Sequence, residues 1–97
     1  MLVEIQVVPS SVGTDTARYA HVDAAIARVQ ESGLTYEVGP LGTSIEGTPE
    51  QLWPLLRAVH EATLESGAGS VMSVIKVGQA AADRGPTMTD LTGKFRT

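Results

Sequence analysis

The sequence predicts an α+β domain in which a four-stranded antiparallel sheet carries two helices on one face. Two segments, 16–32 and 49–65, repeat apolar residues at steps of three and four, which is the period of a helix with one buried face. Four short segments rich in β-branched and other apolar residues lie before, between and after them. Right-handed crossovers between the strands place both helices on the same side of the sheet.

The N-terminal third predicts a strand followed by a helix. A strand is expected over Leu2–Val8, where apolar and polar residues alternate, and Pro9 closes it. A helix is expected over 16–32, with Thr14 or Asp15 as its N-terminal cap. The apolar residues of this segment form one helix face, which consists of Tyr19, Val22, Ala25, Ile26 and Val29.

The stretch from 32 to 51, SGLTYEVGPLGTSIEGTPEQ, is expected to form a hairpin between the two helices. Gly33 suits the left-handed conformation that ends a helix. Apolar residues alternate over 34–38, turn residues follow at 39–42, and a second short strand spans 43–46. Thr48 is a suitable N-cap for the second helix, and Gln51 is placed to complete a capping box.

The last third predicts a helix, a strand and a short terminal helix. The helix over 49–65 ends at Gly67, and a strand rich in valine is expected over 70–77. Residues 79–85 are expected to form a flexible loop. A terminal helix is expected from Pro86 or Thr87, because Thr87 and Asp90 have the spacing of a capping box. Its helically spaced apolar residues are Met88, Leu91 and Phe95.

This order of elements defines a ferredoxin-like βαββαβ sandwich that forms one domain over residues 1–97. The helices cover one face of the sheet and leave the other to solvent, the terminal helix or another subunit. Four apolar residues are expected on that open face, namely Val8, Ile45, Val74 and Ile75. We therefore expect the chain to self-associate.

The composition narrows the classes of function. The 97 residues are 42% hydrophobic and carry a formal net charge of −4, which disfavours binding to nucleic-acid phosphates. No apolar run approaches the roughly 20 residues that span a bilayer, and the N-terminus lacks a signal-peptide pattern. The chain contains no cysteine, which excludes disulfides and thiolate chemistry. We expect a cytoplasmic protein without nucleic-acid or membrane partners.

The stretch 32–51, preceded by a strand that ends in Pro9, resembles the small thiamine-binding-type proteins of the UPF0045 or DUF77 type. The likeness covers nearly the whole chain, and its most specific part is GTSIEG at 42–47. Residues 75–77 resemble the family's last strand, and Arg84 with 88–90 and Lys94 resembles its tail. The resemblance implies assembly into homodimers and homotetramers. It also implies thiamine or its hydroxymethylpyrimidine half as ligand. This chain has Gly78 where the family usually has an acidic residue.

Glu46 is the first candidate for ligand binding. It ends a short strand beside Gly47, where a carboxylate can accept charge-assisted hydrogen bonds from an aminopyrimidine. A solvated strand glutamate, or one that caps a nearby helix, is the alternative. Gly42 and Thr43 form a turn whose backbone and hydroxyl could shape a ligand pocket. Simple hairpin geometry is the alternative for these two residues.

Two aromatic residues and one lysine complete the predicted binding set. Tyr36 and Trp53 could stack on a pyrimidine or hold a thiazolium cation, and the alternative for both is the core or a subunit interface. Lys76 lies in an apolar strand. It could pair with Glu46 or Glu37, bind an anion, or simply lie on a sheet edge.

Neither a metal site nor catalysis is indicated. His21 and His60 have no ligand-spaced partners and are expected at the surface or at an interface. No nucleophile pattern accompanies them. The sequence therefore favours a non-enzymatic protein that binds thiamine or its pyrimidine half at a subunit interface, with no other cofactor. The alternative is a homo-oligomeric structural or regulatory module without this ligand.

Overall fold

The chain follows the expected order of strands and helices. The structure is a computed structural model that describes residues 1–83 and 85–96, so Arg84 of the family-like tail lies outside it. The main elements are β1 (Leu2–Pro9), α1 (Ala20–Glu31), β2 (Thr35–Val38), β3 (Thr43–Glu46), α2 (Pro49–Glu65) and β4 (Val71–Gly78). A 3₁₀ turn (Ala81–Asp83), α3 (Met88–Thr92) and a final 3₁₀ turn (Gly93–Phe95) follow.

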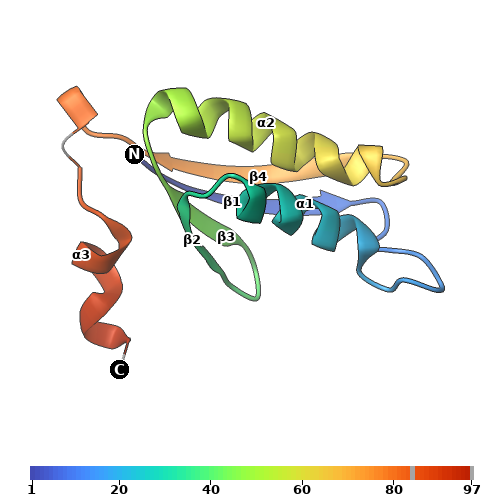
Figure 1. Ribbon diagram of the computed structural model, residues 1–97. Coiled ribbons are helices and arrows are strands. Elements are labelled where there is room, and N and C mark those ends of the chain that lie inside the picture. The colour runs from blue at the N-terminus through green and yellow to red at the C-terminus, as the bar shows by residue number, and fades with distance from the viewer. Residues whose placement is uncertain (84, 97) are drawn as a thin grey trace.

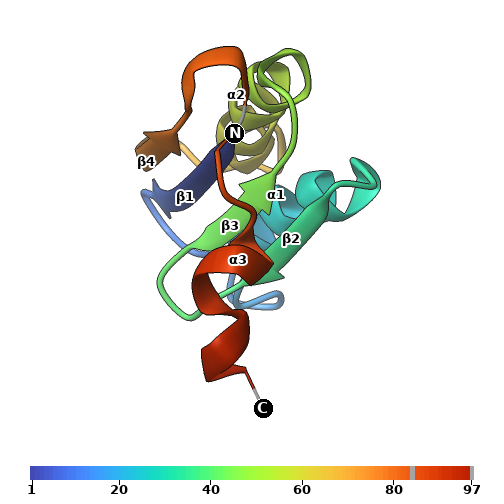
Figure 2. The same ribbon diagram turned by 90° about the vertical axis from the view of Figure 1, so that its left-hand side faces the viewer.

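The four strands form one antiparallel sheet in the order β2-β3-β1-β4. The first strand is therefore central, and β2 and β4 are the edges. Both long helices cover one face of the sheet, as Figure 1 shows, and α3 stands apart from that layer (Figure 2). This arrangement confirms the predicted ferredoxin-like sandwich with a short C-terminal helix.

The core lies between the sheet and the two long helices. Ile45 of β3 and Leu52 of α2 are fully enclosed, and Val29 of α1 is almost so. These side chains come from three different elements, and burial of apolar area is the main favourable contribution to folding. The other buried apolar residues are Val3, Ile5, Ala25, Leu56, Val59 and Ala62.

Local sequence signals set the ends of α2. Thr48 Oγ1 accepts from the Gln51 N–H, and the Gln51 side chain accepts from the Thr48 N–H, so the predicted capping box is present. Gly67, with a φ of 116°, follows the last turn in a conformation that side chains rarely adopt. The helix continues through the exposed Pro54, although a proline in its interior removes one backbone hydrogen bond.

The first helix begins at Ala20 rather than at residue 16, so the predicted start was wrong. Thr14 does cap a turn, because its hydroxyl accepts from the Ala17 N–H at 3.0 Å. That turn does not extend into the helix, whose N-cap Tyr19 makes no side-chain cap. The Val12 carbonyl instead accepts from the N–H of His21 at 3.0 Å. A contact across the loop thus fixes the start, and the local capping pattern does not.

The open face of the sheet is less apolar than the sequence predicted. Ile45 points into the core, which corrects its expected place on the open face. Ile75 pairs with Ile5 of β1 and so shares the helix-covered side, which is a second correction. Val8 and Val74 do lie on the open side and are exposed, as predicted. Val74 and Ile75 could not both lie on the open face, because adjacent residues of a strand point to opposite faces.

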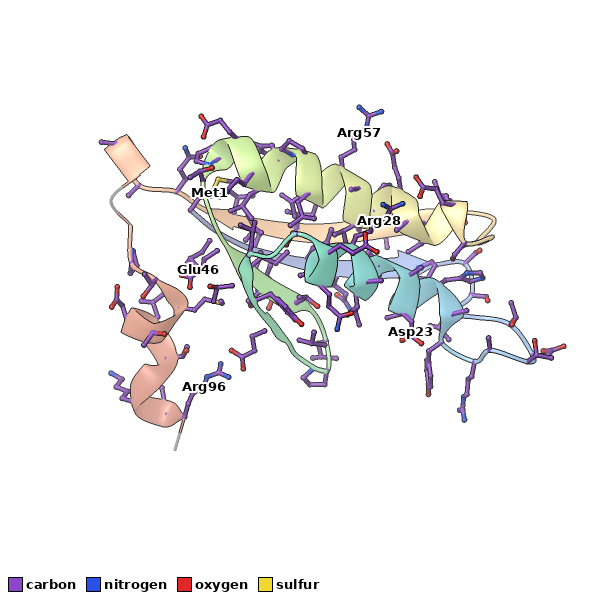
Figure 3. All side chains as sticks on the ribbon, in the orientation of Figure 1. Met1, Asp23, Arg28, Glu46, Arg57 and Arg96 are labelled. Carbon is purple, nitrogen blue, oxygen red and sulfur yellow. The ribbon has the colours of Figure 1, made fainter. Side chains whose placement is uncertain are left out.

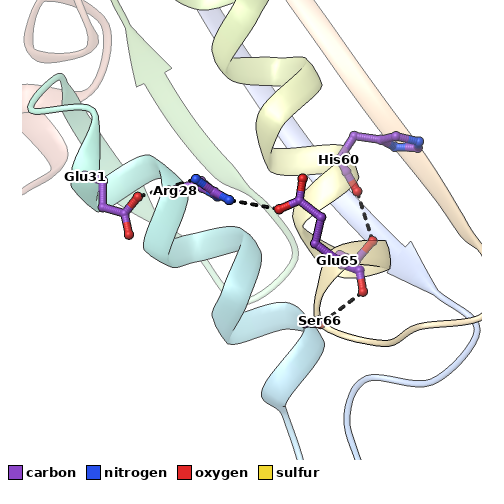
Figure 4. A network of polar contacts seen from close by, with 6 residues as sticks. Arg28, Glu31, His60, Glu65 and Ser66 are labelled. Atoms are coloured by element: carbon purple, nitrogen blue, oxygen red, sulfur yellow. Dashed lines mark hydrogen bonds and ion pairs between the residues drawn. The ribbon is translucent and has the colours of Figure 1, made fainter.

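Two polar contacts join the ends and sides of the two long helices, one of them exposed and the other buried. Arg28 of α1 bonds to Glu65 of α2 at 2.8 Å and lies 3.8 Å from Glu31 (Figure 4). His21 Nδ1 lies 2.5 Å from Ser66 Oγ, and only 4% of this residue is exposed. The predicted surface position of His21 was therefore wrong. The imidazole closes the end of the helix layer, where the neighbouring serine supplies its polar partner.

Residues 85–96, which we call the C-terminal arm, leave the sheet at the end where the N-terminus lies (Figure 1). The predicted capping box of α3 is present, with Thr87 and Asp90 bonded to each other's backbone N–H groups. No residue of α3 is buried. No helix among the described residues is long and apolar enough to cross a membrane.

Candidate functional site

A cleft of about 310 Å³ opens between α1 and the turn that joins β2 to β3. We call it the hairpin cleft. Its floor is strand β1, one wall is the apolar side of α1, and the other wall is the turn at 38–43. Its lining side chains include Tyr19, Ile26, Leu41 and Thr43. The volume and the apolar lining are typical of small-molecule sites.

The hairpin cleft contains two of the predicted binding residues, Gly42 and Thr43. Thr43 is 7% exposed, and its hydroxyl has no hydrogen-bond partner among the described residues. No fully enclosed side-chain oxygen in that part of the chain lacks a partner, so this hydroxyl keeps some accessible surface, and Thr43 lines the cleft. Gly42 lies so close to β1 that an added Cβ would sit 3.3 Å from the Ile5 carbonyl oxygen. Hairpin geometry alone therefore accounts for the glycine, whereas the threonine hydroxyl is available to a ligand.

Tyr19 stands at the rim of the hairpin cleft and was predicted only as part of a helix face. The residue is half exposed, and the Arg18 guanidinium lies 5.4 Å from the centre of its ring. A cation–π contact of this kind shows that the ring face is accessible to positive charge. An aromatic residue at a helix N-cap beside a glycine-containing loop was the signal that could have identified it.

A second cavity, of about 400 Å³, lies on the opposite side of the sheet, between the strands and the C-terminal arm. We call it the open-face pocket. It contains four charged side chains, two acidic and two basic, beside apolar residues of β1 and the arm. The charged residues are Glu4, Glu37, Lys76 and Arg96.

Glu46 holds the arm. Its carboxylate accepts a hydrogen bond from the Met88 N–H at 3.1 Å, and Figure 3 shows the side chain between β3 and the arm. Carboxylates at a helix N-terminus are favoured by the helix dipole. At the other end of the arm, Arg96 forms an ion pair with Glu37. Glu46 therefore makes the contact of a helix-capping residue, one of the two alternatives that the sequence left open.

Lys76 lies on the edge strand β4, as one of the predicted alternatives had it. Its Nζ is 3.9 Å from Glu4 Oε1, and 80% of the side chain is exposed. The predicted partners Glu46 and Glu37 are not the ones it meets. In the register of the sheet Lys76 is the direct neighbour of Glu4, and this proximity decides its partner.

Tyr36 and Trp53 line neither cavity. Tyr36 is 37% exposed on β2, and Trp53 is 53% exposed on α2. The six predicted residues thus do not form one site within the chain: Gly42 and Thr43 line the hairpin cleft, Lys76 lines the open-face pocket, and Glu46 bonds to Met88, which lines the same pocket. Within the described residues no group of three histidine, aspartate or glutamate side chains could hold a metal ion.

Comparison with known proteins shows the family to which the chain is similar. The sequence model of the thiamine-binding protein family matches residues 3–96. A UPF0045 protein of Clostridium perfringens is 34% identical over 94 residues, which are 97% of this chain and 95% of the relative. A UPF0045 protein of Synechocystis is 32% identical over 97 residues, which are all of this chain and 78% of the relative.

Two solved structures share the fold. A DUF77 domain of unknown function from Bacillus cereus has a TM-score of 0.86 and 33% identity, covering 98% of this chain and 88% of its own. A putative thiamine biosynthesis/salvage protein from Thermotoga maritima has a TM-score of 0.81 and 27% identity, covering 98% and 97%. The chain belongs to the thiamine-binding protein family, and small-molecule binding is the property by which that family is described.

Proposed function

We propose that the chain binds thiamine, or its hydroxymethylpyrimidine half, in the hairpin cleft and performs no chemistry on it. The observation that carries this proposal is the Thr43 hydroxyl, which has no partner among the described residues, in a cleft lined mainly by apolar residues. Apolar walls with a few placed polar groups are what an aromatic heterocycle needs. Family membership and the Thermotoga maritima neighbour favour thiamine as that heterocycle.

The two halves of thiamine find different partners in the cleft. The aminopyrimidine ring would lie between Ile26 and Leu41 and bond to the Thr43 hydroxyl. The thiazolium cation would meet the ring of Tyr19, whose face already attracts the Arg18 guanidinium. Because the cleft is open at this rim, a second subunit would be needed to enclose the ligand, and the exposed Tyr36 and Trp53 are the residues we propose for that contact.

Titration calorimetry with thiamine, hydroxymethylpyrimidine and thiamine phosphate tests the proposal, with the oligomeric mass measured on the same sample. Saturable binding is expected. Thr43→Val should weaken it by about 0.5–1.5 kcal/mol, the net value of a neutral hydrogen bond. Thr35→Val is the matched control, because Thr35 is an exposed strand threonine outside the cleft. Equal affinity in the two variants would remove Thr43 from the site.

Glu46 offers a competing position for the same ligand. If its carboxylate accepts hydrogen bonds from the aminopyrimidine, Glu46→Gln should weaken binding by about 1–3 kcal/mol, the range for a bond to a charged group. If the ligand occupies the hairpin cleft, Glu46→Gln should leave its affinity unchanged, because Glu46 does not line that cleft. The Glu46 and Thr43 variants together therefore assign the ligand to one side of the sheet.

A structural or regulatory oligomer without this ligand is the second candidate. The exposed Trp53, Val74 and Met72 favour it, since large apolar residues at a surface often mark an interface. It predicts flat titrations with all three compounds from a folded protein of defined oligomeric mass. With that result, thiamine would no longer be the proposed ligand of this chain.

A further inference from the structure

We propose that the open-face pocket is a second ligand site, which takes a small zwitterion with an apolar side chain, the chemistry of a free α-amino acid. This inference is independent of the proposed thiamine site, which lies on the other face of the sheet. It rests on the arrangement of charges in the pocket, on a free hydroxyl in its floor and on the apolar residues of the arm.

Three of the four charged residues of the pocket form, together with Ser44, a row straight across the sheet. The register pairs Glu37 with Ser44, Ser44 with Glu4, and Glu4 with Lys76. These four residues therefore lie side by side on neighbouring strands, which are about 5 Å apart. The sheet holds the backbone of each residue in place, so the order and the spacing of these residues are set by its register.

Ser44, Glu4 and Lys76 of this row have no close hydrogen-bond partners for their side chains among the described residues. Arg96 already neutralises Glu37, but Lys76 and Glu4 are 3.9 Å apart and both are solvated. An exposed pair at that distance contributes little. Between Glu37 and Glu4, the hydroxyl of the half-buried Ser44 has no hydrogen-bond partner among the described residues. A carboxylate, an ammonium and a hydroxyl are thus free to bind a ligand.

The sum of the charges selects the class of ligand. Two carboxylates and two cations line the pocket, so its formal charge is zero. A phosphate would meet the two carboxylates, and a cation such as thiamine would meet Lys76 and Arg96. A zwitterion places its ammonium on Glu4 and its carboxylate on Lys76, and so forms two charge-assisted hydrogen bonds.

The arm selects an apolar side chain on that ligand. Leu2 of β1 and Met88 and Leu91 of the arm border the charged row. Leu91 is about half exposed, so a branched aliphatic group placed beneath it would remove apolar surface from water. The contacts Glu46–Met88 and Glu37–Arg96 hold the arm at both ends, which keeps this apolar wall over the row.

The test is an NMR titration of the ¹⁵N-labelled full chain with L-leucine and three analogues. 3-Methylbutylamine lacks the carboxylate, 4-methylpentanoate lacks the ammonium, and glycine lacks the side chain. Leucine should shift the amides of Glu4, Ser44 and Lys76 in a saturable way. Each analogue should bind several-fold more weakly. Absence of saturable shifts with leucine, or an analogue that binds equally well, would overturn the proposal.

A matched pair of variants makes the assignment specific. Lys76→Met should weaken leucine binding by about tenfold or more, since a hydrogen bond to a charged group is lost. Lys94→Met removes the same charge from a residue of the arm that does not line the pocket, and it should leave the affinity unchanged. Equal effects of the two variants would contradict the site. Thiamine titrations of Lys76→Met should match the parent protein, so the two proposals can fail separately.

Discussion

The two faces of the sheet differ in what covers them. On one face, Ile45, Leu52 and Val29 are sealed between the strands and two long helices. On the other, the C-terminal arm carries a five-residue helix without a single buried residue, and contacts with Glu46 and Glu37 hold the arm beside the sheet. The covered face supplies most of the folding free energy, because the burial of apolar surface is what chiefly drives folding. The open face is therefore freer to carry polar chemistry without loss of the fold.

The largest effect is expected for a cavity in the covered face. Ile45→Ala should lower the free energy of unfolding by about 2–5 kcal/mol, because it removes a fully enclosed side chain. Val74→Ala on the open face should change it by about 0.5 kcal/mol or less. Urea denaturation of both variants gives the comparison directly.

The same experiment detects a hidden partner on the open face. If Val74→Ala is as damaging as Ile45→Ala, and if its effect depends on protein concentration, a second copy of the chain covers Val74. The open face would then be exposed only in the isolated chain and buried in the oligomer.

A smaller effect is expected from two capping boxes with the same geometry. Thr48 caps α2, which packs on the core, and Thr87 caps α3, which does not. Thr48→Ala should cost about 1 kcal/mol of global stability. Thr87→Ala should leave the unfolding midpoint unchanged and speed amide hydrogen exchange in the arm, since α3 opens without the core. A midpoint that falls equally in both variants would show that the arm unfolds together with the sheet.

These capping boxes also show which parts of the fold can be predicted from sequence. The bounds of α2 and β3 were correct because their signals are local: a threonine and a glutamine three residues apart, and glycines at the ends. The predicted start of α1 was wrong because the Val12 carbonyl, which lies outside the helix, accepts a hydrogen bond from the N–H of His21. A contact of that kind leaves no periodic trace in the sequence.

The candidate sites show the same difference between local sequence signals and contacts made by distant residues. Gly42 and Thr43 were predicted as site residues because turn residues mark a hairpin, and the structure shows that this hairpin forms one wall of a cleft. The partner of Lys76 was missed because it depends on register, which places Glu4 beside it across the sheet. Arg96 was missed because only the path of the arm brings it to Glu37. The sequence shows which residues are charged, but it does not show which of them pair over long distances. That pairing limited the prediction of the sites.

The smallest changes in stability are expected for two ion pairs, one on each face of the sheet. Arg28 bonds to Glu65 between the long helices, and Arg96 bonds to Glu37 between the arm and the sheet. Both pairs are partly exposed, so Arg28→Ala and Arg96→Ala should each change the free energy of unfolding by less than about 1 kcal/mol, with less change at high salt.

The local consequences of these two substitutions should nevertheless differ. The helices stay docked without Arg28 because apolar residues hold them, whereas the arm loses one of its two charged contacts. Hydrogen exchange should therefore stay slow in α1 and α2 of the first variant and become faster in α3 of the second. Equal protection of α3 in the Arg96 variant and the parent protein would mean that apolar contacts or a second subunit hold the arm, and that the open face is built more like the covered one.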